Sequence, residues 1–380
     1  IVKVEATGEY EVTFTLQRPQ APFLKNLAMP PFAIASPAAL QKYGDKFNEN
    51  PVGTGPFKFV EWRRNDRIVI EKFADYWDPK YPILDRVTFV SIPDNSARLN
   101  ALLAGDVDLI DGINYSDVPT IEADSDLKIF SRPSMNVGYV GLTVTRGPMQ
   151  DKRVRQALNH AVNKEEIIQA FYEGYAIPAK NPMPPVISGY NDNIVDYEFD
   201  LEKAKQLLAE AGYPDGFEME LWAMPVPRPY MPDGQKVAEA IKANFEKIGV
   251  KAKIVSMEWG TYLERTAAGD ADAFMLGWTG DNGDPDNFLY VLLDKDNIGT
   301  NNYTYYSNDE LHEILIEAQS TPDEDKRAEL YKRAQEIIKE DAPWIPLVHS
   351  QPLLAGRKDI VNFLPHPTGS DLLHKVDFQK

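Results

Sequence analysis

Two consecutive segments of the chain repeat one pattern, in which a helix is followed by a glycine turn and a short strand. The first is GQKVAEAIKANFEKIGVKAKIVSM (234–257), and the second is WGTYLERTAAGDADAFMLGW (259–278). The stretch ARLNALLAGDVDLIDGI (97–113) follows the same order. Such units are typical of α/β domains, whose helices cover the faces of a sheet. Because other segments break strict alternation, an α/β barrel is not expected.

The remaining periodicity adds further elements. Apolar residues at helical spacing predict one amphipathic helix over 154–172, another over 200–212, and a long helix followed by a strand within 323–349. Alternating apolar residues predict strands at 68–73, 86–92 and 217–224. The opening IVKVEATGEYEVTFTLQ reads as a hairpin, without an initiator Met or an apolar signal region. We therefore expect the natural sequence to extend upstream of residue 1.

Length and charge narrow the class of protein. A chain of 380 residues exceeds one ordinary core, so two or more domains are expected. The 58 acidic and 40 basic residues give a net charge of −18, which argues against binding to nucleic acid or to an anionic membrane surface. The absence of cysteine excludes disulfides, thiolate metal sites and a cysteine nucleophile. No stretch of the sequence approaches eighteen consecutive apolar residues, so no transmembrane helix is expected in it.

Two loops carry charges without an obvious partner. In GWTGDNGDPDNF (277–288), Asp281 and two further aspartates follow an apolar strand, and clustered carboxylates need water or a positive partner. Arg228 follows another predicted strand in LWAMPVPRPYMP (221–232), a loop stiffened by prolines. Both loops leave the carboxyl ends of strands, where ligand crevices form in α/β sheets. A surface arginine and a solvated or capping aspartate are the competing interpretations.

The sequence fits none of the common motifs for catalysis, metal binding or phosphate binding. The histidines are scattered, with His312 expected on an exposed helix, and neither an H-E-x-x-H motif nor a G-x-S-x-G motif occurs. The acidic stretches that begin at Asp281 and Asp294 place Leu292 and Tyr305 where an EF-hand requires Glu. NPVGTGPF lacks the G-K-[ST] of a phosphate loop. A carboxylate-based hydrolase stays an alternative, because the separation of two carboxylates is spatial.

Five stretches carry a resemblance to a known family. They are, in order, NPVGTGPFKFVEW, VRQALNHAVNKEEI, DLEKAKQLLAEAGY, LWAMPVPRPYMP and GWTGDNGDPDNF. Together they resemble the solute-binding proteins of peptide ABC transporters (family 5 of the extracellular solute-binding proteins), most closely the dipeptide-binding branch, over essentially the whole chain. The resemblance implies an α/β, periplasmic-binding-protein-like fold with two lobes and a small accessory domain. It also implies that an N-terminal portion of the family pattern precedes residue 1.

The resemblance implies a domain plan as well. Residues 1–55 would be the remainder of the accessory domain, truncated at its N-terminus. Residues 56–132 and 352–380 would form lobe I, which would be incomplete, and residues 133–351 would form lobe II with the ligand contacts. The chain would cross between lobes near 132–138 and 347–354.

The resemblance assigns the two unpaired charges to a zwitterionic ligand. Asp281 would bind the free α-amino group of a dipeptide, and Arg228 would bind its α-carboxylate. Asp284 and Asp286 would instead cap the turn and the following helix. The other lysines and arginines are expected on the surface.

Neighbouring residues complete the expected site. Gly277, Trp278 and Thr279 would offer backbone groups to the ligand as an added strand does. Tyr230 and Trp278 would line pockets for the ligand's side chains. No catalytic residue, metal or cofactor is expected.

The implied function is capture of dipeptides in the periplasm or at the outer face of the cell membrane, and their delivery to a membrane permease. The protein is expected to be a monomer, to catalyse no reaction and to bind no nucleic acid. Within the same fold, a longer peptide, glutathione, haem or a nickel chelate are alternative ligands. The signal or lipid anchor that would direct export is not visible in this sequence.

Overall fold

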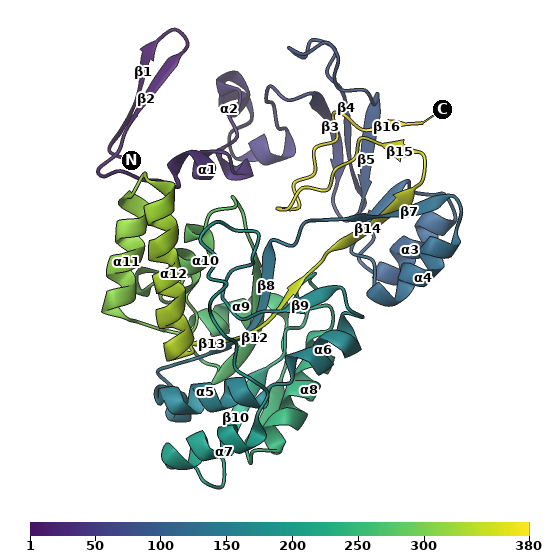
Figure 1. The fold of residues 1–380 in the computed structure, drawn as a ribbon. Helices are drawn as coiled ribbons and strands as arrows, with labels where there is room; N and C mark the ends of the chain where they lie inside the picture. Colours follow the sequence, from purple (N-terminus) through teal and green to yellow (C-terminus); the bar gives the residue numbers. More distant parts are fainter. Residues whose placement is uncertain (380) are drawn as a thin grey trace. The chain divides into compact units, whose positions relative to one another are not determined.

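The computed structural model describes residues 1–379, which pack into two compact units (Figure 1). The first unit contains Ile1–Asn26 and Ser134–Ser350, and the second contains Leu27–Pro133 and the chain from Gln351 onward. Residues 1–26 therefore group with the larger unit and residues 27–55 with the smaller one. The division into an accessory domain and two lobes stays a prediction.

A six-stranded mixed sheet forms the centre of the first unit, in the order β11-β10-β12-β8-β13-β9. Its strands are β8 (Asn136–Leu142), β9 (Ala176–Pro178), β10 (Glu218–Trp222), β11 (Lys251–Val255), β12 (Ala273–Thr279) and β13 (Trp344–Ser350). Strands β11, β10 and β12 are parallel, whereas β8 is antiparallel to both β12 and β13. Every residue of β8 and β13 is buried, as expected for central strands that are covered on both faces.

Helices surround this sheet. They are α5 (Lys152–Ala161), α6 (Lys164–Phe171), α7 (Leu201–Glu210), α8 (Gly234–Glu246), α9 (Trp259–Ala267), α10 (Asp286–Leu293), α11 (Asp309–Ser320) and α12 (Glu324–Asp341). Helices α11 and α12 lie side by side (Figure 1). The unit also contains the predicted hairpin, with β1 (Lys3–Gly8) and β2 (Glu11–Thr15). No helix within residues 1–379 is both long and apolar enough to cross a membrane.

The prediction of a single helix over 154–172 is wrong. Helix α5 ends at Ala161, Val162 is extended, and α6 begins at Lys164. Asn163 caps the second helix, because its side chain accepts a hydrogen bond from the backbone N–H of Glu166 at 3.2 Å. A side-chain cap of this kind offers the backbone an alternative to continuing the first helix.

The second unit contains smaller sheets. Its strands are β3 (Phe57–Arg63), β4 (Arg67–Lys72), β5 (Arg86–Val90), β6 (Leu109–Asp111), β7 (Leu127–Ser131), β14 (Leu353–Arg357), β15 (Ile360–Val361) and β16 (Asp377–Phe378). They form the sheets β3-β4-β5, β6-β14-β7 and β15-β16. Its helices are α2 (Pro37–Tyr43), α3 (Asn95–Leu103) and α4 (Val118–Ala123), while α1 (Phe23–Leu27) ends at the boundary between the units. One core cluster joins Leu354 to Ile360, Phe363 and Val376.

The expectation that the remaining lysines and arginines lie on the surface is wrong for several of them. Arg155 is buried in the first unit, where its guanidinium donates to the carbonyl oxygens of Met149 (2.7 Å) and Asp341 (2.6 Å). Lys164 is also buried, and its ammonium donates to the carbonyl oxygen of Ala179 at 2.8 Å. These cations bind backbone carbonyls outside their own helices, one of them 186 residues away in the sequence, so the helical pattern did not indicate their burial.

Candidate ligand-binding site

Asn287 organises the loop that follows β12. Its buried side-chain oxygen accepts hydrogen bonds from the indole N–H of Trp278 (2.9 Å) and from the backbone N–H of Asp281 (3.0 Å). Its amide nitrogen donates to Oδ2 of Asp281 at 3.1 Å. The Asp281 side chain is exposed and forms no ion pair with any residue that the structure describes. The loop therefore orients a carboxylate that has no fixed counter-charge.

Asp284 has a different role from Asp281, because the Asp284 side chain is fully buried. Its two oxygens accept hydrogen bonds from Nη1 (2.8 Å) and Nη2 (2.6 Å) of Arg327, and the Lys25 ammonium lies 3.1 Å from Oδ2. Burial alone would raise the pKa of Asp284, but the Arg327 hydrogen bonds and charge, with Lys25, hold the pKa below its usual value. The predicted capping role is present, since the Asp286 N–H donates to Oδ1 at 3.1 Å.

The predicted capping role of Asp286 is wrong. Asp286 lies in the first turn of α10 without a side-chain cap, and its Oδ1 accepts a hydrogen bond from the Gln319 amide at 2.8 Å. Burial raises the pKa of this carboxyl to about 6, and the neighbouring Asp284 charge adds to the rise. No arginine or lysine among residues 1–379 forms an ion pair with Asp286, so its ionised form is disfavoured in the folded protein.

This raised pKa predicts that Asp286→Asn stabilises the protein near neutral pH. A folded-state pKa of about 6, against 3.8 for an unperturbed aspartate, means that stability falls as pH rises through this window. Each pKa unit corresponds to about 1.4 kcal/mol, so removing the ionisable group should add up to about 3 kcal/mol at neutral pH. Below about pH 4 the gain should be under about 1 kcal/mol. Urea unfolding of both proteins at the two pH values measures the difference.

Asp325→Asn is the matched control, because Asp325 lies in the first turn of α12 but is exposed. It should change stability by no more than about 0.5 kcal/mol at either pH. A gain from Asp286→Asn that is the same at both pH values would contradict the assigned pKa.

The Arg228 loop is held by its own backbone. Arg228 and Met231 exchange backbone hydrogen bonds of 3.0 and 2.9 Å, which close the loop as a short bridge. The exposed guanidinium donates to the Pro227 carbonyl at 3.0 Å and lies 5.5 Å from the ring centroid of Trp259. Among the residues that the structure describes, no carboxylate pairs with it. Arg228, like Asp281, lacks a fixed counter-charge.

Tyr230 anchors this loop to the central sheet. Its ring covers Gly277 of β12 and its carbonyl oxygen lies against Gly138 of β8, so closely that a Cβ at either glycine would overlap it. The hydroxyl of Tyr172 donates to the same carbonyl at 2.8 Å. Burial raises the pKa of the Tyr230 phenol, and the nearby Arg228 guanidinium opposes that rise. Two glycines that face each other across the strands thus let the Arg228 loop approach β12.

Beyond Phe274, one edge of β12 has no strand beside it in the part of the chain described, because pairing with β10 ends there. On this edge the backbone N–H and C=O of Met275 both bond to the hydroxyl of Tyr262, at 3.1 and 2.8 Å. Backbone groups alternate along a strand, so Gly277 and Thr279 direct theirs to the same edge. The other edge pairs with β8 as far as Thr279.

The structure therefore brings most of the predicted residues to one strand. Tyr230 covers Gly277, and Asn287 ties Trp278 to Asp281. No hydrogen bond or ion pair joins Arg228 to Asp281. Sequence reasoning missed Asn287, although its place at the start of a predicted helix beside the aspartates was a usable signal.

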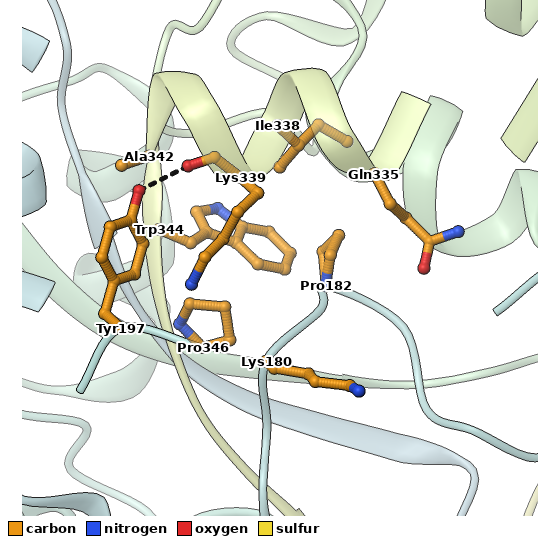
Figure 2. Close-up of a pocket in the computed structure, with 9 residues that line it drawn as sticks. All are labelled: Lys180, Pro182, Tyr197, Gln335, Ile338, Lys339, Ala342, Trp344 and Pro346. Atoms are coloured by element: carbon orange, nitrogen blue, oxygen red, sulfur yellow. Dashed lines mark hydrogen bonds between the residues drawn. The ribbon is translucent and has the colours of Figure 1, made fainter. Parts of the chain in front are cut away.

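The small cavity in Figure 2 lies elsewhere in the same unit, beside α12 and β13. Its volume of about 10 Å³ holds roughly one water molecule, so it does not fit a peptide. The Tyr197 hydroxyl donates to the Lys339 carbonyl oxygen at 2.6 Å, and the Lys339 ammonium lies over the Tyr197 ring. Burial lowers the pKa of Lys339 to about 8, although Asp196 bonds its ammonium at 3.1 Å. This cluster belongs to the core rather than to the site around β12.

Comparison with known proteins adds independent information. Residues 1–300 match the model of the bacterial extracellular solute-binding proteins, family 5. The chain is 40% identical to the dipeptide-binding protein of Escherichia coli, with alignment over 100% of this chain and 72% of that protein. It is also 40% identical to heme-binding protein A of Haemophilus influenzae, over 98% of this chain and 69% of that one.

A solved structure is similar over the whole chain. It is an ABC transporter-associated periplasmic binding protein from Helicobacter pylori in complex with the peptide STSA, with a TM-score of 0.89 and 36% identity. The match covers 100% of this chain and 74% of that one. The predicted α/β, periplasmic-binding-protein-like fold is thereby confirmed.

Proposed function

The chain belongs to family 5 of the bacterial extracellular solute-binding proteins, and from that premise we propose that it captures dipeptides outside the cytoplasm. It would deliver them to the membrane permease of an ABC transporter. Members of this family are transport proteins that bind solutes, so we propose no reaction and no cofactor. We also propose that the protein acts as a monomer and that its ligand contacts come from lobe II (133–351).

The observation that carries the proposal is that three neighbouring aspartates differ in burial and in bonding partners. Asp284 is buried against Arg327 and Asp286 is buried against Gln319, whereas Asp281 is exposed, oriented by Asn287 and without a counter-charge. An oriented carboxylate of this kind is complementary to an ammonium group. The α-amino group of a peptide supplies that cation.

Arg228 would bind the opposite end of the ligand. Its planar guanidinium can donate to both oxygens of an α-carboxylate, and no described carboxylate already occupies it. A dipeptide is a zwitterion whose charges are separated by about 7 Å, at roughly 3.3–3.6 Å per residue. Fixed charges at both ends would select ligand length, because a longer peptide would leave one terminus buried and unpaired.

The open edge of β12 would bind the peptide backbone. Gly277 and Thr279 direct N–H and C=O groups to this edge, and an extended ligand can pair with them as an added strand. Recognition through backbone and termini would leave the ligand's side chains loosely selected. Trp278 and Tyr230 remain the proposed lining of the side-chain pockets, although Tyr230 is buried, with its ring packed on Gly277.

Arg228→Lys should weaken dipeptide binding by about 1 kcal/mol, or roughly fivefold. A lysine keeps the positive charge but cannot form the paired hydrogen bonds of a guanidinium. Isothermal titration calorimetry measures the dissociation constant. Arg265→Lys is the matched control, because Arg265 is a partly exposed arginine of α9 that pairs with Asp270. Equal weakening in both variants, or none in Arg228→Lys, would place the carboxylate elsewhere.

A ligand panel tests the function itself. We expect saturable binding of a dipeptide and weaker binding of tripeptides and pentapeptides, glutathione, nickel chelates and haem. Haem is the second candidate, because heme-binding protein A matches this chain at the same 40% identity as the dipeptide-binding protein. Binding of haem without binding of any peptide would reverse the assignment. Release of free amino acids from the dipeptide would instead indicate a hydrolase.

A further inference from the structure

Asp294 is a buried carboxylate at the end of α10. Its side chain has 0% exposure and its Oδ1 accepts the backbone N–H of Asp296 at 2.9 Å. The imidazole Nδ1 of His312 lies 3.1 Å from Oδ1 and 3.0 Å from Oδ2. In the described part of the chain no lysine or arginine forms an ion pair with Asp294. A buried carboxylate without a fixed cation is costly, so a positive charge placed beside Asp294 would stabilise it.

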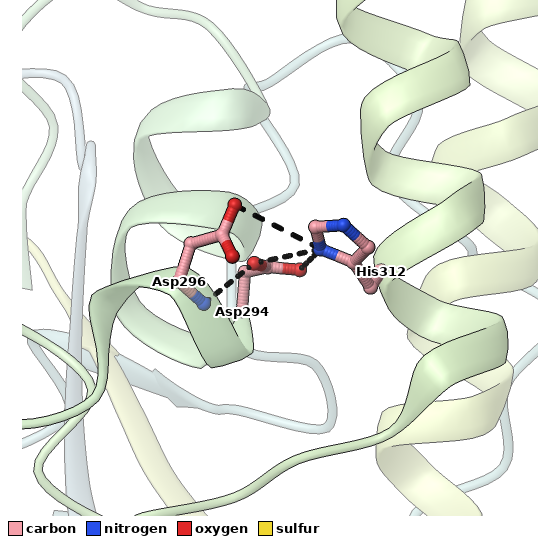
Figure 3. A group of neighbouring side chains, drawn as sticks. All are labelled: Asp294, Asp296 and His312. Carbon is pink, nitrogen blue, oxygen red and sulfur yellow. Dashed lines mark hydrogen bonds and ion pairs between the residues drawn. The ribbon is translucent and has the colours of Figure 1, made fainter.

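His312 and Asp296 complete a cluster of possible metal ligands (Figure 3). One donor atom from each of the three residues lies within 4.8 Å of the others. His312 lies on α11, which has an exposed face as expected, but the imidazole itself is only 23% exposed, because it contacts Asp294 in the loop after α10. The Asp296 carboxylate is half exposed, which leaves a path from solvent.

The local charge balance favours a cation. Even a protonated imidazole neutralises only one of the two carboxylates. The nearby Lys295 ammonium is bonded to the exposed Asp309 instead. The Tyr290 hydroxyl donates to Asp296 Oδ2 at 3.1 Å and so orients that carboxylate.

We infer that Asp294, Asp296 and His312 bind a divalent transition-metal ion such as Zn²⁺. Imidazole nitrogen with carboxylate oxygen suits Zn²⁺ and its first-row neighbours, whereas Ca²⁺ and Mg²⁺ prefer all-oxygen sites. The Asp296 N–H donates to Asp294 and the Tyr290 hydroxyl donates to Asp296, so both carboxylates are held in orientation. Water would complete the coordination on the exposed side.

The ion would have a structural role. Asp294 and Asp296 follow the C-terminal end of α10, and His312 belongs to α11, so the metal would fix one helix against the other. Asp281 precedes the N-terminal end of the same α10. Metal binding would therefore stabilise the helix that holds Asn287, without contact with the peptide ligand.

The test uses protein freed of metal by a chelator. Zn²⁺ should bind with a stoichiometry of one and raise the melting temperature, Mg²⁺ should do neither, and Co²⁺ should give the visible absorption of a coordinated ion. His312→Gln and Asp296→Asn should each weaken Zn²⁺ binding by about tenfold or more. Asp296→Asn serves as the second variant because its exposed side chain can be changed without disturbing the core.

His160→Gln is the matched control, because His160 lies on α5, away from the cluster, and its imidazole contacts the Glu198 carbonyl oxygen. It should leave Zn²⁺ binding unchanged. If wild-type protein shows no saturable Zn²⁺ binding and no thermal shift, the cluster is only an Asp–His ion pair and the inference is overturned. Equal Zn²⁺ affinity in His312→Gln and wild type would overturn it too, because the ion would then bind elsewhere.

Discussion

Arg327→Met is expected to lower the free energy of unfolding by about 3–5 kcal/mol, because it leaves the buried Asp284 charge without its main partner. Arg327 donates to both oxygens of Asp284, to the Ala318 carbonyl oxygen at 3.0 Å and to the Tyr331 hydroxyl at 2.9 Å. Lys25 is partly exposed and compensates little of this loss. Urea unfolding at neutral pH, followed by far-UV circular dichroism, measures the change.

A matched control and a double variant test the cause of this loss. Arg333→Met removes an exposed arginine of the same helix, which pairs with Glu310 and Glu336, and should cost no more than about 1 kcal/mol. Arg327→Met combined with Asp284→Asn should recover part of the loss, since the buried Asp284 charge is removed together with its partner. If Arg327→Met costs no more than Arg333→Met, the buried pair does not stabilise this loop.

Asp281→Asn is expected to weaken dipeptide binding by at least about tenfold, because the ligand's ammonium loses its counter-charge. The substitution keeps the shape of the side chain and can keep the hydrogen bond with Asn287. Stability should change by less than about 0.5 kcal/mol, since Asp281 is exposed. Calorimetric titration with a dipeptide and a thermal melt, run on the same sample, separate affinity from folding.

Asp215→Asn is the control, because Asp215 is another exposed loop aspartate that forms no ion pair with a described residue. It should bind the dipeptide like wild type. An unchanged dissociation constant in Asp281→Asn would remove this carboxylate from the site. Such a result would leave the stabilising role of Asp284 intact, because the two aspartates have separate partners.

Much of the local structure could be predicted from sequence, because it depends on residues a few positions apart. The helix after Asp200 is an example, since its side chain accepts from the Lys203 N–H at 2.9 Å. The break at Asn163 shows the limit of periodicity, because a single local cap outweighed a helical pattern that continued on both sides. The placement of Asp281 and Arg228 after strands also follows from sequence, because apolar strands and proline turns are local signals.

Local sequence is enough to predict that three aspartates follow one strand and that a stiff arginine loop follows another. Which aspartate stays free depends on contacts made in the folded chain, because Arg327 and Gln319 reach Asp284 and Asp286 from helices further along the chain. The same holds for His312, which packing brings to Asp294. The energy of a charge depends on its burial and on nearby opposite charges, and folding sets both across distances that local sequence does not encode.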